Sequence, residues 1–206
     1  KKVDKAIDDV TIPLSKAWGD QNLATDKEEE AAALKAEDPD IKNTIEQIVK
    51  NNGYDYNEYE VLTEDSYRLT MMRVRGKNIA PDAPVVFLQH GLFSDASFWV
   101  LHKEESVAFQ LALAGYDVWM GNNRGSIYSR KHESLDVDKV CDQEQFFDYS
   151  FVELGKYDAP AQIDYIIDVT KNEKISYIGH SQGTSQMFTA LANNYGDLDD
   201  KLNLFV

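Results

Sequence analysis

The feature that most constrains the fold is an alternation of short apolar runs with helical segments in the later part of the chain. The run VVFL (85–88) is continuously apolar, as expected of a strand covered on both faces, and the runs YDVWM (116–120) and ISYI (175–178) read in the same way. Helical patterns separate these runs: one covers residues 104–114, and another begins at Asp158. Strands that alternate with helices form a largely parallel sheet with helices on both faces, so we expect an α/β fold.

The N-terminal part of the chain has a different pattern. Residues 1–38 are rich in Asp, Glu, Lys and Ala, which favours a solvated helix in an acidic extension. Residues 39–206 are expected to form one folded domain. Its first element is predicted to be a short amphipathic helix that begins at Asp38-Pro39 and ends at Gly53. The apolar positions of this helix recur at helical spacing: Ile41, Ile45, Ile48 and Val49.

Residues 56–74 alternate between apolar and polar side chains, as strands with one buried face do. The segments YNEYEVL and YRLTMMRV flank Thr63-Glu64-Asp65-Ser66. We therefore expect a hairpin with an acidic turn.

Charge and cysteine content exclude several classes of function. The formal net charge is −15, and the Lys and Arg residues are scattered, so DNA and RNA are not expected as partners. No run reaches the roughly 18 apolar residues of a transmembrane helix, and Lys1-Lys2-Val3-Asp4 contains no apolar signal-peptide core. Cys141 is the only cysteine, so the chain has no Cys pair for a disulfide, zinc site or redox motif. We predict no metal and no cofactor.

The segment GHSQG (179–183) places Ser181 between two glycines, directly after an apolar run and before a helical pattern. By itself this motif is weak evidence, because a turn serine without chemistry produces it as well. Its context is that of a nucleophile elbow, a sharp turn between a strand and a helix that lifts the serine above the sheet edge. One face of the predicted helix carries apolar side chains: Met187, Phe188, Leu191 and Ala192.

A serine nucleophile also needs two N–H groups to stabilise the negative charge that forms on a substrate carbonyl. One donor is the residue after the serine, Gln182, whose N–H lies at a helix N-terminus. The other is expected in the loop QHGLF, where Gly91 allows a close turn and the Leu92 N–H can reach the same oxygen. We expect His90 and His180 to have structural roles, since His90 lies where this fold has its oxyanion loop and the His180 side chain diverges from the serine hydroxyl.

With these residues in place, the sequence resembles the acid lipase family of α/β-hydrolases. The segments that carry the resemblance are YEVLTEDSYRL, FLQHGLFSDASFWV, LALAGYDVWMGNNRGSIYSRKH, FFDYSFVELGKYDAPAQIDYI and ISYIGHSQGTS, and together they cover about residues 40–206. The resemblance implies that Ser181 is the nucleophile, that Leu92 and Gln182 form the oxyanion hole and that the substrates are neutral lipid esters. It also implies a lysosomal or secretory location, although the chain has no Asn-x-Ser/Thr sequon.

The chain departs from the family pattern in two ways. Ser66 stands where the family has glycine, a change that costs only ease of backbone conformation. More importantly, no histidine follows Ser181, although the triad of this fold runs serine, acid, histidine along the chain. Asp197, Asp199 and Asp200 follow the serine but lie too early for the triad acid. We expect a sheet that is incomplete at its C-terminal side.

Two hypotheses account for this pattern. In the first, the chain belongs to a lipase whose triad acid and histidine lie in a companion polypeptide or segment. In the second, it is a non-catalytic structural or binding subunit of a larger assembly. Retention of Ser181, Leu92 and Gln182 favours the first, since a scaffold has no physical need for an oxyanion pair.

Arg124 in GNNRGS follows a predicted strand. It is expected either to be exposed in a loop or to pair with a carboxylate such as Asp95 or Glu153, which would tie neighbouring loops together.

Overall fold

The computed structural model describes Asp40 and residues 42–206. The acidic extension predicted over residues 1–38 lies outside the described residues, as does the helix start predicted at Asp38-Pro39. The first described helix, α3 (Ile45–Asn51), begins at a capping box in which Thr44 and Gln47 each accept the other's backbone N–H. The predicted apolar positions Ile45, Ile48 and Val49 are buried.

The predicted hairpin is confirmed. Strand β1 (Asp55–Leu62) pairs antiparallel with β2 (Tyr67–Arg75) along its full length. In the turn between them the Ser66 N–H donates to the Thr63 carbonyl over 3.0 Å, and Ser66 has a left-handed φ of 77°. A side chain in this region is strained, so the glycine-to-serine departure falls where glycine is favoured.

The parallel part of the sheet follows the predicted strands. It contains β3 (Val85–Gln89), β4 (Asp117–Gly121), β6 (Ile175–Gly179) and β7 (Leu202–Phe205). The order across the sheet is β1-β2-β4-β3-β6-β7, with a short strand β5 (Lys131–His132) beside β2. Neighbours from β4 to β7 run parallel, which confirms the mostly parallel sheet.

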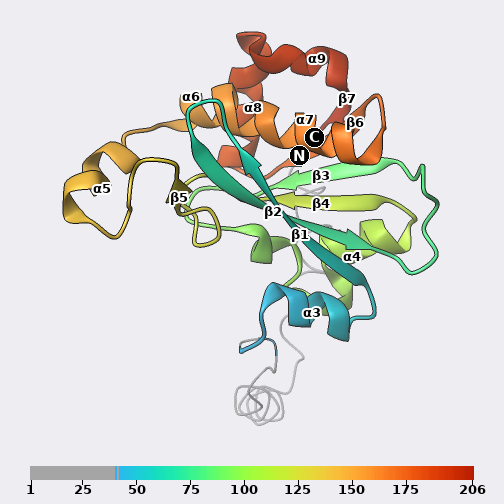
Figure 1. Ribbon diagram of the computed structural model, residues 1–206. Coiled ribbons are helices and arrows are strands. Elements are labelled where there is room, and N and C mark those ends of the chain that lie inside the picture. Colours follow the sequence, from blue (N-terminus) through green and yellow to red (C-terminus); the bar gives the residue numbers. More distant parts are fainter. Residues whose placement is uncertain (1–39, 41) are drawn as a thin grey trace, which may run out of the picture. The chain divides into compact units, whose positions relative to one another are not determined.

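Helices cover both faces of the sheet, as predicted. Alternate residues of β3 point to opposite faces: Phe87 packs in a core with α7 (Ala159–Thr170) and α8 (Gln182–Ala192), and Leu88 packs in a second core with α3 and α4 (Val107–Leu113). Figure 1 shows α7 and α8 together on one side of the sheet and α3 and α4 on the other. No helix of the described part of the chain is long and apolar enough to cross a membrane.

The helix predicted at Asp158 is α7, whose first residue, Ala159, follows Asp158 directly. The helical segment is longer than predicted, because it starts at a capping box formed by Ser150 and Glu153. It runs through α6 (Phe151–Glu153) and a π-helical turn, η4 (Leu154–Asp158), into α7. Phe188 shares the predicted apolar face of α8, yet its side chain is 62% exposed and lies edge-on against Phe205. The buried face of α8 is rotated toward Gln186, Met187 and Ala190.

The remaining elements are short: η2 (Ala96–Trp99), η3 (Lys103–Glu105), α5 (Val140–Phe146), η5 (Tyr195–Asp197) and α9 (Leu198–Lys201).

The connections from β3 define the position of the site. The chain passes from β3 through α4 to β4 on one side, whereas β6, which follows α7, lies on the other side of β3. This arrangement is a switch point, where open α/β sheets bind their ligands at the carboxyl ends of the strands. Gln89 at the end of β3 pairs with both Gly121 of β4 and Gly179 of β6. The three loops that follow these residues therefore start side by side at the same edge of the sheet.

The left-handed conformation of Ser66 leads to a prediction about the free energy of unfolding. Ser66→Gly should raise the free energy of unfolding by about 0.5–1 kcal/mol, because glycine adopts a positive φ without the Cβ penalty. Urea titration measures this change. Ser66→Ala keeps the Cβ and should bring no gain, so equal midpoints for the Gly and Ala variants would contradict the interpretation.

Candidate active site

Ser181 lies in a sharp turn between β6 and α8. Its φ of 52° and ψ of −114° belong to a region that non-glycine residues rarely adopt, and its side chain is exposed. Such a conformation costs about 1–3 kcal/mol and persists only where surrounding contacts impose it. The geometry is that of the nucleophile elbow expected from the sequence.

The glycines on either side of Ser181 allow close backbone packing. A Cβ on Gly179 would lie 2.7 Å from the Thr184 nitrogen, within the elbow itself. A Cβ on Gly183 would collide with the Gln89 carbonyl oxygen and lie 2.9 Å from that of His90. Gly183 therefore lets the start of α8 pack directly on the end of β3.

Hydrogen bonds hold the elbow in this conformation. The buried Tyr177 hydroxyl donates to the Gly183 carbonyl over 2.7 Å, and the Thr184 hydroxyl donates to the Gly179 carbonyl over 2.8 Å. The backbone N–H of His180 donates to the Gln89 carbonyl over 2.9 Å. These contacts supply the stabilisation that the strained serine requires.

The loop after β3 lies against the elbow. A Cβ on Gly91 would be 3.0 Å from the Ser181 Cβ, so only glycine fits there without displacement. Leu92 and Gln182 line one cavity of about 250 Å³. Within the part of the chain that the structure describes, neither backbone N–H of this pair donates to a protein acceptor. The structure thus brings both predicted oxyanion residues to one cavity beside Ser181.

The two histidines near the elbow are held by other groups. The buried His90 ring contacts the Gly91 carbonyl through Nδ1 and the Asn123 backbone N–H through Nε2, so neither nitrogen is available as a base for Ser181. Burial lowers the pKa of His90, so the ring is neutral near pH 7. The exposed His180 ring stacks on Phe98 with centroids 4.6 Å apart.

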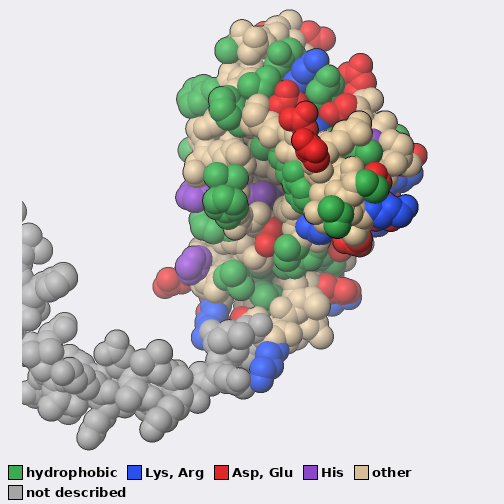
Figure 2. Space-filling view, turned by 90° about the vertical axis from the view of Figure 1, so that its left-hand side faces the viewer, with side chains coloured by type: hydrophobic (Ala, Val, Ile, Leu, Met, Phe, Trp, Pro, Cys, Tyr) green, Lys and Arg blue, Asp and Glu red, His purple; other side chains and the backbone are tan. Residues whose placement is uncertain are grey.

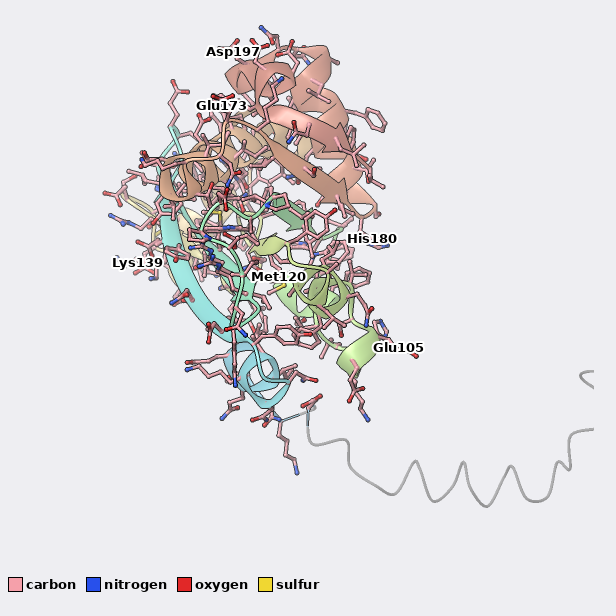
Figure 3. All side chains as sticks on the ribbon, turned by 90° about the vertical axis from the view of Figure 1, so that its right-hand side faces the viewer. Glu105, Met120, Lys139, Glu173, His180 and Asp197 are labelled. Carbon is pink, nitrogen blue, oxygen red and sulfur yellow. The ribbon has the colours of Figure 1, made fainter. Side chains whose placement is uncertain are left out.

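A triad acid and base for Ser181 are missing from the described residues. There, the Ser181 hydroxyl has no hydrogen-bond partner. Figure 3 shows Asp197 well away from His180, the residue that precedes Ser181 in the chain. Asp199 and Asp200 lie in α9, which follows Asp197 directly. No group of three or more His, Cys, Asp or Glu side chains in this part of the chain could hold a metal ion.

Arg124 is buried, and both carboxylates predicted for it are wrong. Asp95 instead caps η2 by accepting the Ser97 N–H, and Glu153 caps α6. The true partners of Arg124 are Asp65 in the hairpin turn, at 2.6 and 2.8 Å, and Asp158 at the start of α7, at 2.7 Å. The guanidinium also lies 3.9 Å from the centre of the Tyr67 ring. Arg124 thus ties the loop after β4 to two distant elements.

The two carboxylates around Arg124 respond differently to their surroundings. Burial is the largest influence on Asp158 and raises its pKa to about 6, although Arg124 opposes the shift. Its contribution to the free energy of unfolding therefore falls as the pH rises from about 4 to about 6. Burial also acts to raise the pKa of Asp65, but hydrogen bonds from Arg124 and Thr63 outweigh it and the net shift is downward. The contribution of Asp65 is thus lost as the pH falls.

Three residues that sequence analysis did not single out complete the site: Tyr177, Asn123 and Gln186. Asn123 and Gln186 are buried, and the Asn123 side-chain amide donates to Gln186 over 2.8 Å. For Asn123 a signal was present, because it belongs to a pair of asparagines, Asn122 and Asn123, that follows the last residue of β4. Tyr177 and Gln186 lie inside a strand and a helix, and nothing in their spacing separates them from core positions.

The face of the molecule seen in Figure 2 has no large basic patch. Figure 2 shows, on one face, Lys and Arg side chains in small separate groups among Asp and Glu.

Comparison with known proteins gives a consistent result. Residues 84–203 match a family model described as alpha/beta hydrolase fold, and residues 45–103 match one described as partial alpha/beta-hydrolase lipase region. The chain is 45% identical to gastric triacylglycerol lipase of Rattus norvegicus over 76% of its length, which is 40% of that protein. It is 44% identical to lysosomal acid lipase/cholesteryl ester hydrolase of Homo sapiens over 77% of its length and 40% of that protein. The resemblance to acid lipases is therefore confirmed.

The chain spans about two fifths of the length of these relatives. Among solved structures, an esterase of Pyrococcus furiosus matches with a TM-score of 0.50 and 22% identity, covering 70% of this chain and 48% of that one. This likeness concerns the fold alone.

The Arg124 cluster makes a prediction about stability. Arg124→Ala should lower the free energy of unfolding by about 3–5 kcal/mol, because it leaves the buried Asp158 carboxylate without its partner. Arg130→Ala is the matched control, since Arg130 pairs with Asp138 at the surface and exposed ion pairs contribute little. Denaturant titration measures the free energy of unfolding of both variants. Equal losses in the two would contradict a buried, paired Arg124.

The close contact between α8 and β3 leads to a prediction about Gly183. Gly183→Ala should lower the free energy of unfolding by about 1–3 kcal/mol, because the new methyl group meets backbone on β3 that cannot move aside easily. Gly76→Ala is the control, since its Cβ would make only an ordinary contact, 3.4 Å from the Ala112 carbonyl oxygen. Urea midpoints that rank the two variants in the opposite order would contradict this packing.

Proposed function

The chain belongs to the α/β-hydrolase fold family, and from that premise we propose that it is part of a serine-dependent lipase that hydrolyses neutral lipid esters. The observation that carries the proposal is the strained Ser181 elbow next to Leu92 and Gln182, two residues that line one cavity and whose backbone N–H groups donate to no acceptor among the described residues. A strained serine at a strand end has no purpose in packing, whereas a nucleophile must be exposed in this way.

In the proposed reaction the Ser181 oxygen attacks the ester carbonyl carbon. The carbonyl oxygen becomes negatively charged and accepts hydrogen bonds from the Leu92 and Gln182 N–H groups. Gln182 is the first residue of α8, so the positive end of the helix dipole adds to this stabilisation. The Ser181 proton passes to the histidine proposed below and from it to the leaving oxygen, so the ester C–O bond breaks and the alcohol leaves. Water then hydrolyses the acyl-serine, which releases the carboxylic acid and restores the Ser181 hydroxyl.

The lining of the cavity supports a lipid ester as substrate. Besides Leu92 and Gln182, its wall includes Phe93, Phe147 and Leu154, which offer apolar surface to an acyl chain. The relatives are named as a triacylglycerol lipase and a cholesteryl ester hydrolase. We extend the same substrate class, neutral acyl esters, to this chain.

Catalysis in this proposal needs groups beyond the described residues. A serine without a general base keeps its proton, and loss of a triad member costs on the order of 10⁴–10⁶ in rate. We propose that residues 39–206 form the N-terminal part of the lipase domain and that a companion polypeptide or segment supplies the acid and histidine. Exposed apolar side chains at the site, such as Leu92 and Phe93, suit both that segment and the substrate.

The alternative proposal is a non-catalytic subunit. It is favoured by one observation, the lack of any hydrogen-bond partner for the Ser181 hydroxyl among the described residues.

Labelling with a serine-directed fluorophosphonate distinguishes the two proposals. The isolated chain should react very slowly, and the native assembly should react at Ser181 at the rate of an active lipase. Ser181→Ala in the same assembly should abolish the label. Mass spectrometry of the labelled peptide identifies the modified residue.

Absence of labelling in the native assembly, in a sample where a control lipase reacts, would overturn the catalytic proposal and leave the non-catalytic subunit.

A further inference from the structure

The carbonyl of Gly91 and the N–H of Leu92 belong to the same peptide unit. None of the described peptide bonds is cis, and in a planar trans peptide the C=O and N–H bonds point in opposite directions. A group that holds the Gly91 carbonyl therefore also determines where the Leu92 N–H points.

His90 is that group. The residue is 2% exposed, and Nδ1 of its ring lies 2.8 Å from the Gly91 carbonyl oxygen. On its other side, Nε2 lies 3.1 Å from the backbone nitrogen of Asn123, which can only donate. Nε2 must then be the acceptor, and Nδ1 carries the proton that is donated to Gly91.

We propose that His90 is a positioning residue that aims the Leu92 N–H into the oxyanion hole by clamping the opposite end of the same peptide. This inference rests on the proposed function of Ser181. It assigns His90 neither proton transfer nor contact with the substrate.

The clamp also connects the two oxyanion donors to each other. Asn123, which fixes the tautomer of His90 through its backbone, donates through its side chain to Gln186 over 2.8 Å. Gln186 lies in α8, four residues after Gln182 and therefore on the same side of that helix. The relay Gln186–Asn123–His90 thus links the helix that presents one donor to the loop that presents the other.

Burial suits the His90 ring to this task. It lowers the pKa of His90, which keeps the ring neutral. A protonated ring would present Nε2–H to the Asn123 N–H, and two donors cannot bond to each other.

Two substitutions at His90 test the hydrogen bonds of the two ring nitrogens one at a time. In His90→Asn the side-chain amide nitrogen occupies the place of Nδ1, so the bond to the Gly91 carbonyl is kept and the one from Asn123 is lost. In His90→Gln the longer side chain places its oxygen near Nε2, so the bond from Asn123 is kept and the clamp is lost. His102→Gln, at an exposed histidine, is the control.

The first readout needs no catalysis. Residual dipolar couplings report the direction of the Leu92 N–H in ¹⁵N-labelled chain. The coupling should match that of the unsubstituted protein in the Asn variant and differ from it in the Gln variant, and ¹⁵N shifts of His90 should show the proton on Nδ1. An unchanged Leu92 coupling in the Gln variant, or a proton on Nε2, would overturn the inference.

The second readout is the rate of fluorophosphonate labelling of Ser181 in the native assembly. His90→Gln should slow it by about 10²–10³-fold, the effect of losing one oxyanion donor, while His90→Asn stays close to the unsubstituted rate. Equal losses in both variants would indicate a packing role and refute the clamp. If Ser181 of the unsubstituted assembly is not labelled, the proposed function fails. The dipolar couplings still test whether His90 orients the Leu92 N–H.

Discussion

The site depends on the contact between the start of α8 and the end of β3. Gly183 packs on the carbonyl oxygens of Gln89 and His90 with no room for a side chain, while the His180 N–H bonds to the Gln89 carbonyl. Because Gln89 also pairs with Gly121 and Gly179, this one residue brings three loops to the same level. The groups assigned a role near Ser181 lie on these strands, on the loops that follow them or on α8.

Strain and burial at this edge of the sheet are balanced by polar contacts. Ser181 holds an unfavourable backbone conformation, and the hydroxyls of Tyr177 and Thr184 bond the carbonyls on either side of it. Arg124 performs a similar task farther out, where it joins the hairpin turn to α7 through Asp65 and Asp158. The strained turn can thus be kept rigid while its serine stays exposed.

Much of the fold could be predicted because apolar runs, turn residues and helix periodicity are local signals. The positions of the parallel strands and the hairpin followed from them. The start of the helix before α7 was also readable, since Ser150 and Glu153 have the spacing of a capping box, but the prediction relied on Asp158 and Pro160 instead. The exposure of Phe188 was not readable, because spacing shows which residues share a helix face but not how that face is rotated toward the sheet.

The sequence by itself determined the turn at Ser181, since the strand, two glycines and helix that build it are consecutive in the chain. It also determined that Leu92 and Gln182 follow strand ends and so can approach each other. Only the tertiary structure decided the partners of Arg124, which lie 59 and 34 residues away, and the two bonds of the His90 ring. The physical reason is that strand order and register choose which distant groups meet, and a buried polar group bonds to whichever partner that arrangement brings within reach.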